Sequence, residues 1–255
     1  ILATKYGSWP YKSSQIKNVT IRQLLEHNSG WSNTGGDVMF KSNLKSHKEI
    51  IDYILNDRGL LASPGIQFEY LNFGYTVLGR VIEQKTGVSY QSYIRNKVLA
   101  PAGIRAMRIG RRSKTQKYLN EVTYHPSNAY NLRPDIMDAH GGWIASAVDL
   151  SRLMVRIDKN YRRKDILKIS TIDTMFDATG PNSNFAKGFV TLSTGAGHGG
   201  SMRGTKAYWF QRFNGYTFAI LFNSSPSGDY PSFKARKLVN EIINEVPQFS
   251  KYDLF

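Results

Sequence analysis

The dipeptide Asn214-Gly215 stands between two short runs that are rich in aromatic and β-branched residues, 206–211 and 216–223. Asn-Gly between such runs is a strong local signal for a β-hairpin, because a type I′ turn needs positive φ angles at both central residues. Apolar residues then recur at helical spacing through 235–246. The sequence therefore predicts two antiparallel strands followed by a helix that packs against one face of the sheet.

The first two thirds of the chain have mainly helical patterns. Thr20 with Gln23, and Ser46 with Glu49, match the capping box, in which two side chains bind the free N–H groups of a helix start. Further helix starts are expected at Asn72, Ser89 and Ser146, and helix ends at Gly87 and Pro101. The expected fold class is α+β, with a helical region over 1–184 and antiparallel strands with a terminal helix over 185–255.

Composition narrows the chemistry. The chain has no cysteine, which excludes disulfides, zinc-thiolate sites and cysteine nucleophiles. Its 34 Lys and Arg against 19 Asp and Glu give a net charge of +15, which favours anionic partners. The densest basic cluster, 105–117, lacks the interleaved aromatic residues of single-strand binders. We therefore expect a solvated loop there and no specific nucleic-acid partner, while an anionic polymer or surface stays open.

The histidines do not suggest a metal site. His27, His125 and His140 have no metal-ligand spacing with one another or with carboxylates, so we expect core or loop roles for them and neither a metal nor a cofactor. No stretch approaches the roughly 18 apolar residues of a membrane span. The compartment stays unknown, with a mild lean toward a secreted protein from glycosylation-type tripeptides at Asn18 and Asn223.

Several segments occur together in a particular order. They are 19–30, which ends in Glu-His-Asn-Ser-Gly; 64–87, which contains Tyr-x-Asn; 138–150; and 197–201, Gly-His-Gly-Gly-Ser. This set resembles the β-lactamase-related serine hydrolase family, which includes class C β-lactamases, D-alanyl-D-alanine carboxypeptidases and esterases. The resemblance covers nearly the whole chain and implies a β-lactamase/transpeptidase-like fold, in which the two regions together form one incomplete catalytic domain.

The resemblance implies acyl transfer through a serine ester, with roles for the Tyr-x-Asn motif. Tyr70 would relay the nucleophile's proton, which near neutral pH requires nearby cations to lower its pKa from about 10. Asn72 would hold a substrate amide and the catalytic lysine. A buried tyrosine beside a helix cap is the alternative interpretation of Tyr70.

The segment His198-Gly199-Gly200 stands where the penicillin-acting enzymes have Lys-Thr-Gly. The resemblance implies that His198 is a proton-switchable donor facing Tyr70. The glycines would let a substrate approach the strand edge closely. The backbone N–H of Ser201 would form half of an oxyanion hole. An exposed turn histidine is the alternative interpretation of His198.

The family's nucleophile lies in a Ser-x-x-Lys motif on a helix upstream of the segment that resembles 19–30. Two matches, Ser14 to Lys17 and Ser42 to Lys45, are as frequent as chance predicts and lie in the wrong place. We expect the nucleophile to come from a complementing N-terminal segment or chain outside this one, so the chain alone is expected to be inactive. We also expect it to expose a sheet edge and apolar surface.

The resulting hypothesis is a serine hydrolase acting on a small-molecule or peptide acyl substrate, an ester, an amide or a β-lactam. Two alternatives stay open: a catalytically inactive binding or scaffold protein, favoured by the missing nucleophile, and a basic surface protein that binds an anionic polymer. Intact Tyr70, Asn72 and His198 favour the hydrolase, because a scaffold has little physical need for all three.

Overall fold

The structure is a computed structural model that describes residues 6–7, 10–41, 43–225, 230–246 and 248–249. The chain forms two compact units, each assembled from three stretches of sequence. The first consists of Ile1–Ile94, Pro134–Trp143 and Thr174–Thr191, and the second of Arg95–Arg133, Ile144–Asp173 and Leu192–Phe255. The proposed division at 184/185 concerns the layout of the motifs and stays a prediction.

The first unit is helical, as expected. Its elements in chain order are η1 (Ser14–Asn18), α1 (Ile21–Leu25), η2 (Val38–Phe40), α2 (His47–Asp57), α3 (Asn72–Thr86), α4 (Tyr90–Ile94) and α5 (Pro134–Gly141). Both predicted capping boxes are confirmed. Thr20 and Gln23 bind each other's backbone N–H groups at the start of α1, and Ser46 and Glu49 do the same for α2. These caps start each helix where the sequence placed it.

The start of α3 differs from the prediction. Leu71 is the N-cap residue, Asn72 is already helical, and no side chain caps the helix. The side chain of Asn72 donates instead to Asp37, which lies 35 residues earlier. The assignment of Asn72 as a cap is therefore wrong, because a tertiary hydrogen bond replaces the local one. Gly87 ends the helix in a left-handed conformation, as predicted.

Helices α2 and α3 bury the apolar core of the first unit. Their fully or nearly fully buried side chains include Ile50, Ile51, Ile54, Phe73 and Val77. The spacing of these residues places them on one stripe of each helix. The burial of these stripes holds α3 in place, and the Tyr-x-Asn motif lies at the start of this helix.

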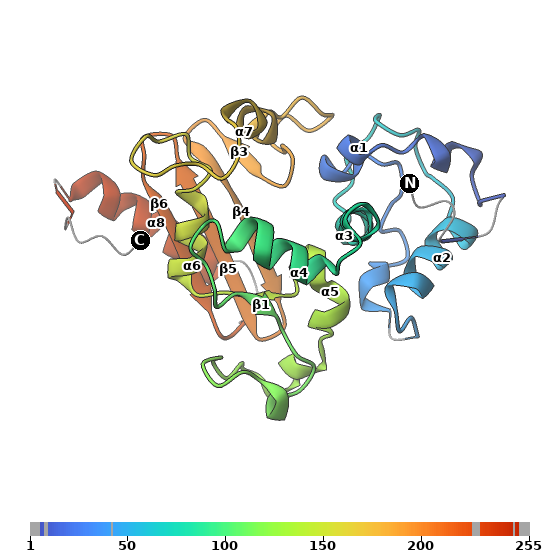
Figure 1. Cartoon of the computed structure of the whole chain (residues 1–255), viewed down its shortest axis with the longest axis horizontal. Helices are drawn as coiled ribbons and strands as arrows, with labels where there is room; N and C mark the ends of the chain where they lie inside the picture. The colour runs from blue at the N-terminus through green and yellow to red at the C-terminus, as the bar shows by residue number, and fades with distance from the viewer. Residues whose placement is uncertain (1–5, 8–9, 42, 226–229, 247, 250–255) are drawn as a thin grey trace. The chain divides into compact units, whose positions relative to one another are not determined.

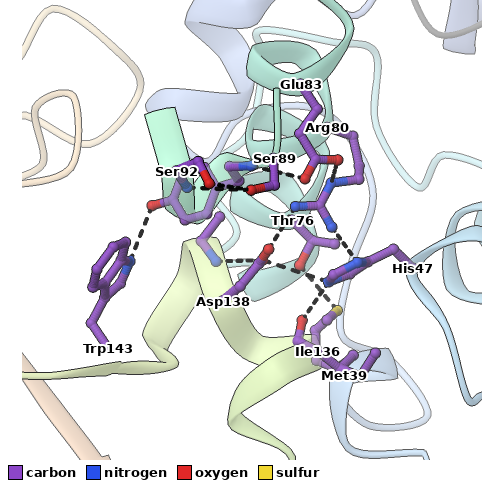
Figure 2. Close-up of polar contacts among 12 residues, drawn as sticks. Met39, His47, Thr76, Arg80, Glu83, Ser89, Ser92, Ile136, Asp138 and Trp143 are labelled. Atoms are coloured by element: carbon purple, nitrogen blue, oxygen red, sulfur yellow. Dashed lines mark hydrogen bonds and ion pairs between the residues drawn. The ribbon is translucent and has the colours of Figure 1, made fainter. Parts of the chain in front are cut away.

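A buried charged network joins α2, α3 and α5 beside this core (Figure 2). Arg80 lies 2.6 Å from Asp138 and 2.9 Å from Glu83, and its side chain is only 3% exposed. A guanidinium can only donate, so Nδ1 of His47 accepts from Arg80 and Nε2 donates to the Ile136 carbonyl at 2.8 Å. His47 therefore links Arg80 of α3 to the backbone of α5.

The charge of Asp138 is stabilised within the same network. Burial alone raises the pKa of Asp138, but the hydrogen bond from His47 and the charge and hydrogen bond of Arg80 outweigh it, so the net pKa is lowered. The ion pair therefore stays intact at neutral pH.

The second unit carries the sheet. Its elements are η3 (Arg95–Leu99), β1 (Arg108–Ile109), η4 (Lys114–Gln116), η5 (Ser127–Asn131), α6 (Ala147–Met154), β4 (Gly195–Met202), β5 (Thr205–Arg212), β6 (Thr217–Phe222) and α8 (Tyr230–Glu245). Three elements, β2 (Trp143–Ile144), α7 (Ile169–Phe176) and β3 (Val190–Leu192), contain a boundary between the units. The predicted cap of α6 is confirmed by the hydrogen bond from Asp149 N–H to the Ser146 side chain.

The strand order is β3-β4-β5-β6, and β4 and β6 both pair antiparallel with β5 (Figure 1). Helix α8 covers one face, where Arg236 lies over the Tyr208 ring and Arg212 donates to Asn240. Gln211 points to the opposite face, because neighbouring residues of a strand alternate, and it donates to the Asp158 carbonyl just after α6. The predicted strands and terminal helix are thus confirmed.

The turn between β5 and β6 is not the predicted type I′ turn. Gly215 has a φ of 95°, but Asn214 is not among the residues with positive φ. Gly215 N–H donates to the Arg212 carbonyl, and Arg212 N–H donates to the Tyr216 carbonyl at 2.7 Å. This pattern is that of a three-residue loop with a type I turn and a left-handed glycine. The hairpin is confirmed, whereas its turn type is corrected.

Of the two outer strands of the described sheet, β6 has apolar side chains around it. Among the strands that the structure describes, β3 and β6 each have a neighbour on one side only. Leu221 of β6 and Leu238 and Ile242 of α8 are exposed. No helix in the described part of the chain has both the length and the apolar character to cross a membrane.

Candidate active site

Tyr70 and Asn72 lie on either side of Leu71, where an extended segment enters α3. The side-chain amide of Asn72 donates to a carboxylate oxygen of Asp37 at 2.7 Å. The other oxygen of Asp37 accepts from Met39 N–H at 2.9 Å, which caps η2. Because a carboxylate only accepts, Nδ2 of Asn72 must be on the Asp37 side. Oδ1 of Asn72 is thereby directed away from Asp37 as an acceptor.

The environment of Tyr70 favours the neutral phenol. Burial raises the pKa of Tyr70, and the negative charge of Asp37 raises it further. The expected lowering by nearby cations is therefore not found among the described residues, and the shift has the opposite direction. The side chain nevertheless stays 40% exposed, so the phenol is within reach of solvent.

An aromatic cluster supports the inner side of Tyr70. The His27 ring lies 4.3 Å from the Tyr70 ring and 4.8 Å from the Phe185 ring, and Phe68 lies 5.4 Å from Phe185, all between ring centroids. The His27 side chain is buried, and its backbone has a φ of 56°, which is uncommon for a residue other than glycine. This cluster accounts for the burial that shifts Tyr70.

A buried ion pair fixes the segment that carries Phe185. Lys187 lies 2.8 Å from Glu26, with both side chains at most 6% exposed, and it also donates to the Asp177 carbonyl at 2.7 Å. Glu26 is the residue before His27, so the pair joins two sides of the aromatic cluster. Removing one partner of a buried pair leaves an uncompensated charge, which makes this connection hard to break.

His198 lies within β4, opposite Trp209 of β5, so it is not an exposed turn histidine. Its Nδ1 lies 2.6 Å from the carbonyl oxygen of Gly199. A carbonyl only accepts, so Nδ1 carries the proton of the neutral ring and Nε2 is the basic nitrogen. Burial lowers the pKa of His198, although the hydrogen bond to Gly199 opposes the shift. The neutral ring is therefore the favoured form at neutral pH.

The glycines of β4 have two different surroundings. A Cβ on Gly197 would lie 2.2 Å from the Trp209 carbonyl oxygen, so only glycine fits against β5 there. A Cβ on Gly200 would meet nothing within 4 Å. A two-residue connection joins β3 to β4, which places the three-residue β3 beside the first residues of β4. The stretch from His198 to Ser201 lies beyond it.

The predicted site residues thus form two groups. Tyr70 and Asn72 lie together in the first unit, while His198, Gly199, Gly200 and Ser201 are consecutive in β4 of the second unit. Asp37 and His27 join the first group, although Asp37 had no sequence signal and His27 was expected to have only a core or loop role. The signal for His27 was its place in the segment 19–30.

The other candidates have separate positions. Ser14 is exposed on the 3-10 turn η1, and Ser42 lies outside the described residues. His125 pairs with Ser224, and Trp31 packs in the core against Phe73. Burial lowers the pKa of His140 to about 4. No group of three or more metal-binding side chains converges within the parts of the chain that the structure describes.

Known proteins share both the sequence pattern and the fold. Penicillin-binding protein 4* of Bacillus subtilis (strain 168) is 33% identical over 115 residues, which are 42% of this chain and 25% of that protein. The chain thus matches about a quarter of the length of this relative.

Two solved structures are similar over most of the chain. D-amino acid amidase from Ochrobactrum anthropi SV3, complexed with L-phenylalanine amide, matches with a TM-score of 0.72 and 19% identity, over 93% of this chain and 74% of that one. The octameric penicillin-binding protein homologue from Pyrococcus abyssi matches with a TM-score of 0.69 and 24% identity, over 91% and 59%. These similarities show the fold and confirm the α+β, β-lactamase/transpeptidase-like prediction.

A family model extends the match to nearly the whole chain. The model described as Beta-lactamase covers residues 4–240, which include both motif groups. With the helical unit, the antiparallel sheet and the two motif groups in place, the chain belongs to the β-lactamase-related serine hydrolase family.

Proposed function

We propose that this chain contributes proton-transfer and substrate-holding groups to a serine hydrolase active site that cleaves an ester, an amide or a β-lactam. A serine oxygen bonds to the acyl carbon, and the alcohol or amine leaves with a proton. Water then hydrolyses the serine ester and restores the hydroxyl. Family membership supports serine hydrolase or amidase-type activity in general. The substrate class and the residue roles are the proposal.

The observation that carries the proposal is the fixed arrangement of Tyr70 and Asn72 around Leu71. Asp37 orients the Asn72 amide, and Oδ1 is then a suitable acceptor for a substrate N–H or a lysine ammonium. The raised pKa of Tyr70 keeps its hydroxyl protonated. Tyr70 in this state passes a proton on as a donor and acceptor, rather than acting as a phenolate.

His198 is the proposed basic group in β4. Its lowered pKa and its Nδ1–H bond to Gly199 leave Nε2 unprotonated at neutral pH. The N–H of Ser201 would contribute to an oxyanion hole, and the open space at Gly200 would admit the acyl group to the strand edge. A lysine at the position of His198 would supply a fixed charge instead of a base.

The proposed nucleophile is a serine outside residues 1–255, on a segment that complements the second unit. Ser14 is an unsuitable nucleophile, because it is exposed on a short 3-10 turn rather than at the start of a buried helix. The outer strand β6, with Leu221, Leu238 and Ile242 exposed around it, fits the addition of a further strand. An outer strand of this kind promotes association.

Kinetics of the native protein test this proposal. Tyr70→Phe and His198→Asn should each lower kcat/KM for chromogenic ester and D-amino-acid amide substrates by about 100-fold or more, as loss of a general acid–base group does. Matched controls are Tyr53→Phe, on the outer part of α2, and His125→Asn, in the second unit; both should stay within about 2-fold. Equal activity of Tyr70→Phe and the wild type would exclude the proposed role of Tyr70.

A catalytically inactive binding protein is the second candidate, and two observations favour it. Tyr70 has a raised rather than a lowered pKa, and Asn72 is engaged by Asp37, so both side chains also suit a static polar surface. This candidate predicts no turnover and no covalent adduct with any acylating reagent, together with saturable binding of acyl compounds. Turnover that depends on Tyr70 would eliminate it.

A further inference from the structure

His27 contacts three consecutive residues around the proposed proton relay. Its backbone carbonyl accepts from Glu69 N–H at 2.7 Å, and its Nδ1 accepts from Leu71 N–H at 3.0 Å. The same imidazole ring lies 4.3 Å from the Tyr70 ring, at an interplanar angle of 36°. A single residue thus holds the main chain on both sides of Tyr70 and supports its ring.

We propose that His27 is a positioning residue that fixes the Tyr70 phenol and the Asn72 amide in their working orientation. The inference rests on the proposed function, since it concerns the same site. His27 does not act on the substrate in this proposal. It acts through Leu71, whose N–H is the last donor before α3 begins at Asn72. A shift of Leu71 would move Tyr70 and Asn72 together.

The hydrogen bond to Leu71 defines the state of the imidazole. A backbone N–H can only donate, so Nδ1 must be unprotonated, and the proton of the neutral ring is on Nε2. The bond is buried, and a buried N–H that loses its acceptor keeps the full cost of desolvation. A leucine or phenylalanine at 27 would fill the same space without supplying this acceptor.

The backbone of His27 is also suited to this contact. Its φ of 56° turns the chain so that the carbonyl and the side chain both face the 69–71 segment. The neighbouring residues Asn28 and Gly30 bind the main chain just before that segment. Their carbonyls accept from Gly65 N–H at 2.7 Å and from Leu61 N–H at 2.8 Å. A Cβ on Gly30 would lie 2.3 Å from the Ala62 carbonyl oxygen. His27 therefore lies in a segment whose main chain is closely packed against residues 61–71.

Two substitutions separate the acceptor from the ring. His27→Asn keeps a polar acceptor close to the position of Nδ1 and tolerates positive φ, whereas His27→Phe keeps an aromatic ring and loses the acceptor. In the native protein, His27→Phe should lower kcat by about 10- to 100-fold with KM changed by less than about 2-fold, because small misplacements cost that much. His27→Asn should recover kcat to within about 5-fold of the wild type.

A control substitution separates positioning from general loss of stability. Ile54→Val lies in the core of the same unit, on α2, and shortens a side chain that is 2% exposed. At a temperature at which this control and His27→Phe are both fully folded, the control should keep wild-type kcat. If His27→Asn loses as much kcat as His27→Phe, or if the control loses as much, the positioning role is overturned.

Two spectroscopic readouts test the inference even if the protein turns out not to be a hydrolase. The 15N resonances of His27 should show protonated Nε2 and unprotonated Nδ1. The amide hydrogen of Leu71 should exchange faster in His27→Phe and remain protected in His27→Asn. Absence of turnover in the wild type, with these two results, would reject the proposed function and keep the structural role of His27. A protonated Nδ1 or unchanged exchange in His27→Phe would reject that role.

Discussion

The Tyr-x-Asn group and the His-Gly-Gly group are held in place by different means. Side chains distant in sequence hold the first: His27 binds Leu71, Asp37 binds Asn72, and Phe185 supports the aromatic cluster. Main-chain pairing of β4 with β5 holds the second, with His198 opposite Trp209. The first group should therefore be sensitive to changes of distant side chains, and the second to changes that alter strand pairing.

Burial shifts the pKa of Tyr70 and the pKa of His198 in opposite directions, but it favours the neutral form of both side chains. It raises the pKa of Tyr70 and lowers the pKa of His198, because in each case it disfavours the charged form. Both groups are thereby kept neutral at neutral pH.

The largest expected effect is a loss of stability when the buried charged network of Arg80 and Asp138 is broken. Asp138→Asn leaves Arg80 buried with less compensation, and breaking such pairs costs about 3–5 kcal/mol in the free energy of unfolding. Urea unfolding measures this loss. Asp173→Asn is the control, since Asp173 pairs with Lys159 at the surface and should change stability by less than about 0.5 kcal/mol. Equal effects of the two substitutions would contradict the buried network.

The next effect is a pH dependence that comes from His140 in the first unit. The pKa of His140 is about 4 in the folded protein, because of burial, against about 6.5 in the unfolded chain. Between these values the unfolded state binds a proton that the folded state does not, so stability falls as the pH drops from 6.5 to 4, by about 3 kcal/mol in total. His140→Gln should flatten this slope, as urea midpoints across the range will show. An unchanged slope would show that His140 does not cause this pH dependence.

A substitution in β4 tests the second group. Gly197→Ala places a Cβ against the Trp209 carbonyl oxygen and should lower the free energy of unfolding by about 1–3 kcal/mol. Gly200→Ala is the matched control for stability, because its Cβ meets nothing within 4 Å. Thermal unfolding of both variants decides the point. Similar melting temperatures would mean that β4 does not depend on the close approach of β5.

The smallest expected effect is a change in the pKa of Tyr70. Asp37→Asn removes the charge that raises the pKa of Tyr70, while burial of the ring remains. The pKa of Tyr70 should therefore fall but stay above its ordinary value of about 10. NMR of 13C-labelled tyrosine rings measures this titration. An unchanged value would show that burial alone is responsible, and the charge of Asp37 is then not felt at Tyr70.

Local patterns in the sequence predicted the elements that depend on neighbours along the chain. The capping boxes at Thr20 and Ser46, the cap at Ser146 and the hairpin at 205–222 were all predicted. The turn type at Asn214 was wrong, because loop length and strand register decide it. Helices α5 and α7 were not predicted as elements, since the residues before them, Arg133 and Lys168, are not types that cap a helix start.

Tertiary contacts account for what the sequence did not predict in the site. Asn72 resembles a helix cap locally, yet Asp37 binds its side chain from 35 residues away. Arg80 and Asp138 are 58 residues apart and show no shared pattern. The direction of the Tyr70 shift depends on which side chains enclose the ring, and no motif specifies them. The motif residues themselves were identified by resemblance to the family.

Tyr70 and His198 are proposed to serve a serine nucleophile outside residues 1–255. Intact-mass and peptide-level mass spectrometry of the native protein, incubated with a fluorophosphonate or a penicillin, tests this most directly. We expect one adduct, on a serine outside this range, that forms more slowly in Tyr70→Phe and His198→Asn. An adduct on Ser14 or Ser42, or no adduct on any species, would contradict it.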